Sequence, residues 1–335
     1  MSEIVYDQSL NLPVIAEADV LVAGGGPGGL GAAVMAARAG ADVVLVERYG
    51  HLGGMATDGE VQPFMPNHVK GRTLDTPVYV EWAERMHRYL PAELRESKPF
   101  DPAIPGNDQR MISKDAAMLA AADLCAETAL RPLYHHWVAD AIVEDRRIRA
   151  VVLLSKSGFA AAQAGCYVDC TGDGDLAALA GCDFEQGGPS GHSQPMTLCF
   201  KLSHVDRSRL PPREELNRLY DAAKERGEIH DPRENVLHFS YFDDDVVHFN
   251  TTRVCYKKGT SGIDLSDAEQ DARRQIRELL EFFRSQVSGF EQCRIHSIGH
   301  HIGVRETRRI KGLSFITRDD FTNARRSSIV LGVVG

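Results

Sequence analysis

Two short apolar runs, separated by a stretch rich in glycine and alanine, stand out in the first fifty residues. Residues 19–23 and 43–46 are short and rich in valine, which predicts two buried strands. Alanines 32, 33, 36 and 37 between them give a helix a small-residue face that can lie close to a sheet. Gly40 follows and can end that helix. The pattern predicts a strand–helix–strand unit with parallel strands.

The turn that opens this helix has glycines at the GxGxxG spacing: Gly24, Gly26 and Gly29. A tight turn, the close approach of a phosphate, and helix-on-strand packing each exclude a side chain there. The helix start, with Pro27 and Gly28, then points at a pyrophosphate. Glu47 ends the second strand, where a carboxylate can accept both ribose hydroxyls and would repel a 2′-phosphate. The unit predicts an adenine dinucleotide site and argues against an NADP-type ligand.

Farther along the chain, the pattern predicts a second set of elements. Residues 136–143 and 148–154 are two apolar strands joined by a charged turn, whereas 187–199 are rich in Gly, Ser and Pro and fit a crossing between lobes. Beyond them we expect helices over 213–226 and 266–285 and strands over 238–242 and 246–255; an earlier helix is expected over 79–89. Ser266 and Glu269 form an S-x-x-E start for the long helix.

Composition narrows the class of protein. The chain has 335 residues, 43% of them hydrophobic, and a net charge of −9. It is long enough for two lobes, and its charge argues against nucleic acid or an acidic membrane surface as the main partner. It has no run of eighteen apolar residues, and its first ten residues carry acids instead of a basic signal region. We expect a cytoplasmic protein and leave its oligomeric state open.

Seven cysteines without a CxxC pair give no zinc or iron–sulfur pattern. We expect mostly buried free thiols. Asp169 and Asp173 flank a Thr-Gly turn that opens a helix, so a cap and a ligand-contacting loop explain them better than a metal does. No metal site is predicted.

A second glycine pair, Gly53-Gly54, follows Glu47 by a short loop and marks another close backbone approach. This order of acid, loop and Gly-Gly resembles the FAD-dependent oxidoreductases of the two-dinucleotide-binding-domain (glutathione reductase-like) superfamily. By that resemblance Glu47 would hold the AMP ribose and Arg48 would lie beside the adenine. Four further residues would approach the pyrophosphate and the flavin ring: Gly53, Gly54, Met55 and Thr57.

Two later segments resemble the same superfamily. Residues 167–181, YVDCTGDGDLAALAG, resemble the strand, Thr-Gly-Asp turn and helix that return the chain to the FAD domain, which implies flavin contacts by Thr171, Gly172 and Asp173. The strand that contains Val138 would offer backbone to the adenine. His135 and His136 are adjacent on that expected strand, so they would face opposite ways and form no simple ligand pair.

Residues 303–312 match the GxRETRRIxG signature of one subgroup of these oxidoreductases, although such a run by itself also fits a solvated charged strand. The Arg305 guanidinium can hold a carboxylate or stabilise negative charge on reduced flavin. A nearby histidine, His301 or His300, can carry a proton. The predicted catalytic residues are Arg305 and His301.

The resemblance implies an α/β fold: a Rossmann-like FAD-binding domain with a parallel sheet and an inserted α+β substrate lobe. The expected division is an FAD-binding domain at 1–64 and 105–186, an entrance segment at 65–104, a substrate/cap lobe at 187–299, and a return toward the FAD domain at 300–335. The last residues lack the strand and helix with which relatives close the FAD site, so we expect a C-terminally incomplete chain.

These observations predict an FAD-dependent oxidoreductase that transfers a hydride between a small organic substrate and noncovalent FAD. Two alternatives stay open: a truncated, catalytically silent nucleotide-binding protein, and an NAD-dependent dehydrogenase. The substrate, the direction of transfer and the electron acceptor are left open.

Overall fold

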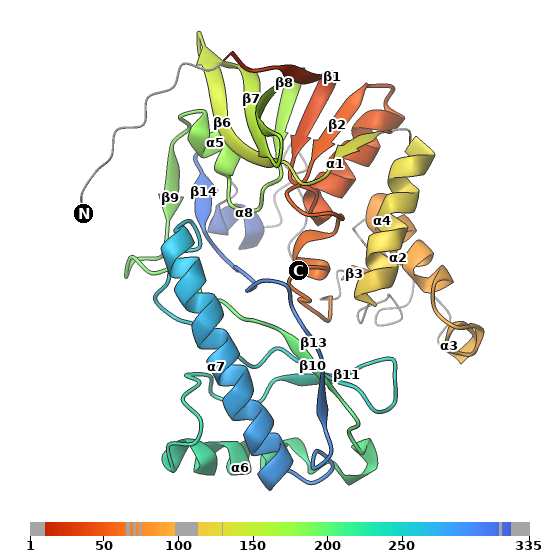
Figure 1. Cartoon of the computed structure of the whole chain (residues 1–335), viewed down its shortest axis with the longest axis vertical. Coiled ribbons are helices and arrows are strands. Elements are labelled where there is room, and N and C mark those ends of the chain that lie inside the picture. Colours follow the sequence, from red (N-terminus) through yellow and green to blue (C-terminus); the bar gives the residue numbers. More distant parts are fainter. Residues whose placement is uncertain are drawn as a thin grey trace.

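Two sheets at opposite ends of the molecule organise the fold (Figure 1). The computed structural model describes residues 11–64, 68–69, 72–73, 76–97, 113–128, 130–314 and 317–322. The larger sheet belongs to the first half of the described chain, and the smaller one to the segment after residue 199. This mixed α/β architecture confirms the predicted fold class.

The larger sheet has six strands in the order β5-β2-β1-β8-β7-β6. Their bounds are β1 Val14–Ala23, β2 Val43–Val46, β5 Arg131–Leu133, β6 Trp137–Glu144, β7 Arg147–Ser155 and β8 Gly158–Asp169. The first four strands in this order are parallel, and β7 and β6 are antiparallel to their neighbours. The carboxyl ends of β2, β1 and β8 therefore meet at one edge.

Strand β1 begins five residues before the apolar run that predicted it. Its first half pairs only with β8, because its pairing with β2 starts at Val20. That half is mostly exposed, whereas Leu21, Val22 and Ala23 are fully buried. The apolar run therefore marks only the part of β1 that pairs with both β2 and β8 and is covered on both faces of the sheet.

Three helices cover one face of this sheet: α1 Pro27–Arg38, α2 Val78–Arg88 and α4 Lys114–Thr128. The alanines of α1 and α4 let the helices pack closely, and the Trp82 indole donates a hydrogen bond of 2.9 Å to the Ala117 carbonyl. Gly40 follows α1 with φ +93°, as expected for a residue that ends a helix. The short helix α3 Ala92–Ser97 adds no buried residue.

The β6–β7 hairpin and α5 Asp175–Leu179 contribute to the core on the other face, where Leu21, Val44, Val151 and Leu176 meet. The prediction that His135 lies on a strand is wrong. His135 has φ +59° in the turn before β6, which starts at Trp137, because the chain turns there to pass from β5 at one edge of the sheet to β6 at the other.

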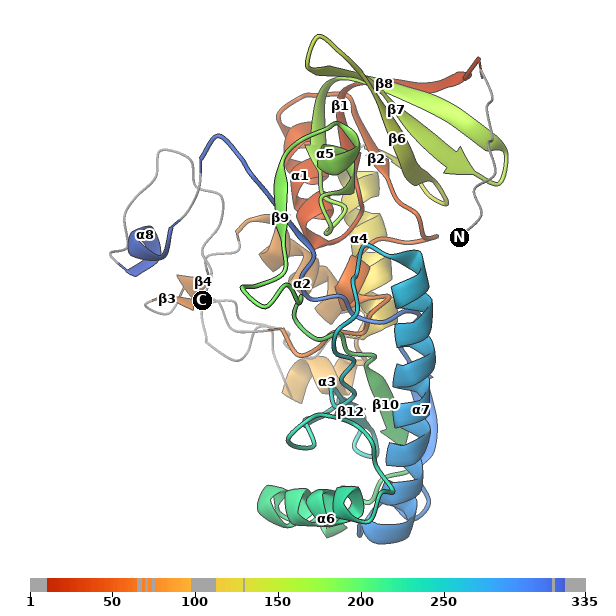
Figure 2. The ribbon, with the colours of Figure 1, turned by 90° about the vertical axis from the view of Figure 1, so that its left-hand side faces the viewer.

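The smaller sheet is antiparallel, in the order β11-β12-β10-β13. Its strands are β10 Phe200–Ser203, β11 His238–Ser240, β12 Val247–Phe249 and β13 Arg294–Ile298. Helices α6 Arg213–Glu225 and α7 Gly262–Gln286 pack on one face, and Figure 2 shows α6 crossing near one end of α7. Phe200, Phe249 and Phe283 are fully buried between the sheet and α7.

The predicted start of α7 is wrong. The helix begins at Gly262, and Ser261 is its N-cap, with the Asp264 amide donating to the Ser261 hydroxyl at 3.2 Å. The Ser266–Glu269 pair lies inside the helix. The actual N-cap, Ser261, lies five residues before Ser266 and forms an S-x-x-D start with Asp264, so the helix begins sooner.

The connection between the lobes is a two-stranded sheet of β9 Phe184–Gln186 and β14 Arg308–Ile310. The remaining elements are η1 Gly54–Ala56, β3 His68–Val69, β4 Arg72–Thr73, η2 Arg207–Arg209 and α8 Arg318–Thr322. Parts of the expected entrance segment, at 65–67, 70–71, 74–75 and 98–104, and the expected C-terminal truncation, at 323–335, lie outside the described residues. The domain bounds stay a prediction.

All seven cysteines are free, as expected, but only Cys125, Cys199 and Cys293 are buried. Within the described ranges, no helix combines the length and the apolar character that a membrane crossing requires.

Candidate active site

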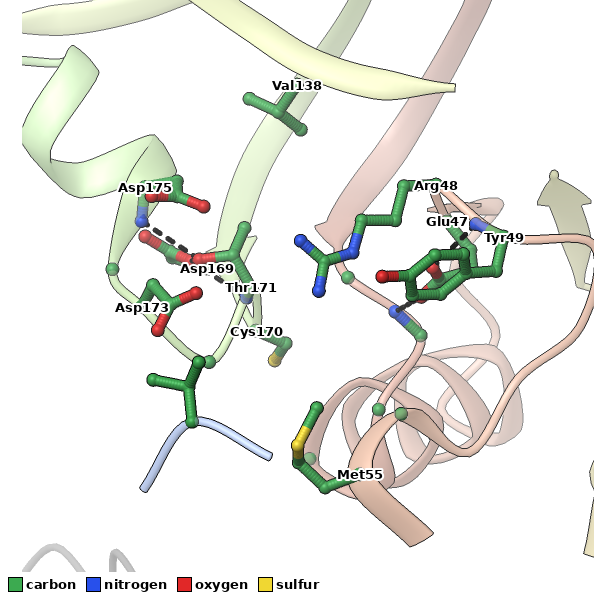
Figure 3. A pocket seen from close by; sticks show the side chains of 18 of the residues that line it. Glu47, Arg48, Tyr49, Met55, Val138, Asp169, Cys170, Thr171, Asp173 and Asp175 are labelled. Carbon is green, nitrogen blue, oxygen red and sulfur yellow. Dashed lines mark hydrogen bonds between the residues drawn. The ribbon is translucent and has the colours of Figure 1, made fainter. Parts of the chain in front are cut away.

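A cavity of about 750 Å³ lies at the carboxyl edge of the parallel strands. Figure 3 shows the loop after β8 on one side of it, the end of β2 on the other, and Met55 close to the glycine turn. This volume is in the ordinary range for a cofactor site. The parallel order β2-β1-β8 is what brings these three chain segments together.

The glycine turn has the tight geometry that its spacing predicts. A Cβ on Gly29 would lie 1.8 Å from the Gly24 carbonyl oxygen, and a Cβ on Gly24 would lie 2.3 Å from the Cys170 carbonyl oxygen. Helix α1 starts at Pro27 after Gly26 and has no side-chain cap. Its first N–H groups are therefore available to an anion in the cavity, which suits a pyrophosphate.

Glu47 is buried at the end of β2 and held in place by backbone. Its carboxylate accepts the Gly25 amide at 2.7 Å and the Tyr49 amide at 2.9 Å. Each oxygen keeps a further lone pair, so the carboxylate can still accept hydroxyl groups from a ligand. This position fits the predicted ribose contact.

The side of the cavity next to Glu47 is aromatic and cationic. The Arg48 guanidinium lies 4.8 Å from the Tyr49 ring and 5.2 Å from the Trp137 ring, and Val138 lies beside them on β6. Flat, polarisable groups of this kind suit a planar heterocycle such as adenine. Neither Tyr49 nor Trp137 was predicted as a site residue, although both are sequence neighbours of residues that were.

The Thr171-Gly172-Asp173 loop is braced from both ends. Asp169 accepts the Thr171 hydroxyl at 2.7 Å and the Ala177 amide at 2.8 Å, which confirms its capping role. Burial raises the pKa of the Asp173 carboxyl, while its hydrogen bond from the Thr307 hydroxyl, 2.8 Å, opposes that shift. Thr307 lies in the RETRR run, so that segment folds directly onto the predicted flavin-contacting loop.

Within that run, Arg308 is the arginine that lines the cavity. Its Nη1 donates to the Asp173 carbonyl at 3.0 Å and to the Asp175 carboxylate at 2.7 Å. Arg305 is exposed and does not line the cavity, and within the described residues it makes no hydrogen bond or ion pair. The structure therefore does not bring Arg305 together with the other predicted residues, and its role stays a prediction.

Gly53 and Thr57 build the second glycine turn and do not line the cavity. A Cβ on Gly53 would lie 2.4 Å from Thr57 Cγ2, and the buried Thr57 hydroxyl donates to the Leu52 carbonyl at 3.2 Å. Gly54 and Met55 do line it, and a Cβ on Gly54 would lie 2.9 Å from the Gly26 Cα. The two glycine turns pack on each other at the cavity wall.

His301 joins the cavity from the smaller-sheet side. Its Nδ1 lies 2.9 Å from the Ile302 carbonyl, which can only accept, so the neutral ring carries its proton on Nδ1. Its buried Nε2 has no hydrogen-bond partner among the described residues, and its ring stacks on Tyr49 at 5.3 Å between centroids. Nε2 is thus a free basic lone pair at the site.

Helix α7 adds a site residue, Glu269, that the sequence pattern predicted only as part of a helix start. Glu269 lines the cavity and accepts the Ile302 amide at 2.6 Å, which fixes the backbone beside His301. Of the predicted cofactor residues, twelve line the cavity: Gly24, Gly26, Pro27, Gly28, Glu47, Arg48, Gly54, Met55, Val138, Thr171, Gly172 and Asp173. The other three, Gly29, Gly53 and Thr57, do not line the cavity and pack behind the residues that do.

Comparison with known proteins agrees with this arrangement. Residues 19–334 match the family described as FAD dependent oxidoreductase. No curated protein sequence matches the chain.

Several solved structures are similar at low sequence identity. p-Nitrophenol 4-monooxygenase PnpA from Pseudomonas putida DLL-E4 has a TM-score of 0.51 at 13% identity, over 89% of this chain and 70% of that one. BexE, studied for oxidation during BE-7585A biosynthesis, has 0.49 at 16%, over 88% and 54%. A geranylgeranyl bacteriochlorophyll reductase-like protein from Thermoplasma acidophilum has 0.46 at 14%, over 86% and 66%. The chain thus spans 54% to 70% of their lengths, and at 13% identity the similarity to p-nitrophenol 4-monooxygenase shows the fold alone.

The family match covers nearly the whole chain, and the glycine turn, Glu47 and the Thr171 loop fit its cofactor. The chain therefore belongs to the FAD dependent oxidoreductase family, and it is an oxidoreductase with FAD as its cofactor.

Proposed function

We propose that this chain catalyses hydride transfer between a small organic substrate and noncovalently bound FAD, with His301 as the proton carrier. The observation that carries the proposal is the free, buried His301 Nε2 in the cavity that the two glycine turns and the Thr171 loop also line. FAD supplies the hydride chemistry when it is bound. The subgroup with the GxRETRRIxG signature is part of the same proposal.

The residues that would hold FAD divide the cavity into two regions. The start of α1 receives the pyrophosphate, and Glu47 receives the adenosine ribose. Arg48 and Val138 then lie where the adenine would be, and Met55 and Asp173 lie toward the ring end. His301 lies on the segment that enters from the smaller-sheet lobe, and its ring stacks on Tyr49.

The role of base that we propose for His301 is supported by three contacts that hold its ring. Its Nδ1 proton is held by the Ile302 carbonyl, Glu269 fixes the Ile302 amide, and Tyr49 limits the tilt of the ring. Nε2 can therefore accept a proton from a substrate hydroxyl, amine or carbon acid as the hydride leaves. Such proton transfer contributes about 10²–10⁴-fold to rate.

The test is anaerobic reduction of the bound flavin, followed by its absorbance, with NADH, NADPH and a panel of small alcohols, amines and acids. We expect at least one compound to bleach the flavin, and His301→Ala to slow that step about 100-fold or more at saturating FAD. The exposed His296→Ala variant serves as the control and should reduce at the normal rate. Equal rates in His301→Ala would refute the role of His301.

The same assay tests Arg305 and the alternatives. Arg305→Lys reduces more slowly if the guanidinium stabilises charge during transfer, and an unchanged rate would remove it from the proposal. Bound FAD that no compound reduces would favour the catalytically silent alternative.

A further inference from the structure

We propose that His51, Asp58 and His300 form a binding site for one divalent transition-metal ion, such as zinc, next to the flavin cavity. The three side chains come from separate segments: the loop after β2, the residues after η1, and the loop after β13. No spacing in the sequence links them. One ligand atom from each lies within 4.8 Å of the other two.

The distances fit a shared ion. His51 Nε2 and His300 Nδ1 each lie 3.2 Å from the same oxygen, Asp58 Oδ1. Two ligands bound at 2.0–2.2 Å to a tetrahedral ion are about 3.3 Å apart. The contacts therefore have the separation of neighbouring ligands on one metal.

Hydrogen bonding on the far side of His51 supports this reading. Its Nδ1 lies 3.3 Å from the Leu52 carbonyl, which can only accept, so the neutral ring carries its proton on Nδ1. In that tautomer Nε2 carries the lone pair that a metal ion would bind, 3.2 Å from Asp58 Oδ1. A backbone carbonyl on the other ring nitrogen is the usual support for a metal-bound histidine.

Asp58 gives an independent indication. Its side chain is 1% exposed, yet Oδ2 is buried without a hydrogen-bond partner among the described residues. A buried carboxylate oxygen with no donor is costly unless a cation satisfies it. The backbone is already set for the site, because the His300 amide donates to the Asp58 carbonyl at 2.7 Å.

The types of ligand indicate which ions the site would bind, and the exposure of His300 gives such an ion a route from solvent. Two imidazoles and a carboxylate suit zinc and other first-row divalent ions, and they leave a coordination position open. The His300 side chain is 54% exposed, so an ion can enter from solvent. The site would join the loop beside the second glycine turn to the smaller-sheet lobe that carries His301.

The experiment is a zinc titration of the full chain loaded with FAD, after treatment with EDTA, by isothermal calorimetry and by metal analysis after gel filtration. We expect one zinc per chain, with affinity at least tenfold weaker in His300→Ala and in Asp58→Asn. His230→Ala is the control, since His230 pairs with Glu278 at 3.2 Å on the surface and has no third ligand among the described residues. It should bind zinc like the unchanged protein.

His300→Ala alters a half-exposed side chain and keeps the test valid if Asp58→Asn fails to fold. The proposal is overturned if the unchanged protein retains no zinc, or if His300→Ala binds zinc with the same affinity as the unchanged protein. Either result would mean that the three side chains form only a hydrogen-bonded His–Asp–His cluster. The readout needs no substrate or turnover, so it is separate from the test of hydride transfer.

Discussion

At the scale of single residues, the cofactor site depends on Glu47, whose carboxylate is fixed by two backbone amides. Glu47→Gln keeps the size but removes the charge, so hydrogen bonds to the ribose become weaker by about 1.5–3 kcal/mol. We expect the Kd for FAD to rise roughly 10- to 100-fold. Fluorescence titration of deflavinated protein measures this change.

The control for Glu47 is Glu17→Gln, which alters an exposed carboxylate on β1 of the same lobe. Its FAD affinity should match that of the unchanged protein. An unchanged Kd in Glu47→Gln would mean that the ribose lies elsewhere.

His248 gives a prediction about pH. Burial, helped by the nearby Lys201 charge, lowers the pKa of this fully buried histidine to about 3. Between pH 6.5 and 3 the unfolded chain binds a proton that the folded chain refuses, so folding stability falls as the pH falls through this window. At pH 5 this penalty is about 2 kcal/mol, and at pH 7.5 it is close to zero.

His248→Phe removes the titrating group while keeping a ring. Urea unfolding at pH 7.5 and 5.0 should show about 2 kcal/mol less loss of stability in His248→Phe than in the unchanged protein. The exposed His296→Phe variant should keep the full pH dependence that His248 causes. Parallel pH dependence in His248→Phe and the unchanged protein would contradict the assignment.

At the scale of elements, the β1–α1 turn is the most restricted part of the fold. Gly29→Ala places a Cβ 1.8 Å from the Gly24 carbonyl oxygen, so the helix must move away from the strand. We expect loss of FAD from the purified protein and a lower thermal midpoint. Absorbance at the flavin bands and a melting curve measure both effects.

Gly31→Ala is the matched control, two residues along the same helix. A Cβ there meets nothing within 4 Å, and alanine favours helix over glycine by about 1 kcal/mol. This variant should keep FAD and melt at the same or a higher temperature. Similar losses in both variants would mean that a clash with the Gly24 carbonyl is not the reason for a glycine at position 29.

At the scale of the whole molecule, the two lobes are joined by a buried ion pair. Lys201 on β10 donates to Glu60 at 2.5 Å, and Lys114 Nζ lies 3.3 Å from the other oxygen. Burial alone would raise the pKa of the Glu60 carboxyl, but the two lysines and Ser297 hold it below its ordinary value. Glu60 comes from the larger-sheet lobe, and Lys201 from the smaller-sheet lobe.

Lys201→Met should destabilise the protein by about 3 kcal/mol or more, because it leaves a buried carboxylate with only Lys114 and Ser297 as partners. Adding Glu60→Gln should restore part of that loss, as urea unfolding would show. The exposed pair of Arg209 and Glu291 is the comparison, and Arg209→Met should cost less than about 1 kcal/mol. Additive losses in the double variant would rule out direct coupling.

Much of the cofactor half could be predicted from sequence. The glycine spacing, the valine-rich β2 and the acid at Glu47 are local features, because each follows from the geometry of a single strand–helix–strand unit. The start of α7 and the placement of His135 were wrong, since a cap or a turn residue competes with a periodic pattern over only a few positions.

The sequence by itself determined a dinucleotide-binding strand–helix–strand unit, its place in a parallel sheet and the resemblance to FAD enzymes. The tertiary structure decided that Arg308 reaches the cavity while Arg305 is exposed, that Glu269 of α7 supports His301, and that His51, Asp58 and His300 converge. The physical reason is distance along the chain. These contacts join residues from 33 to 242 positions apart, so they depend on how distant elements pack, and no local pattern records that packing.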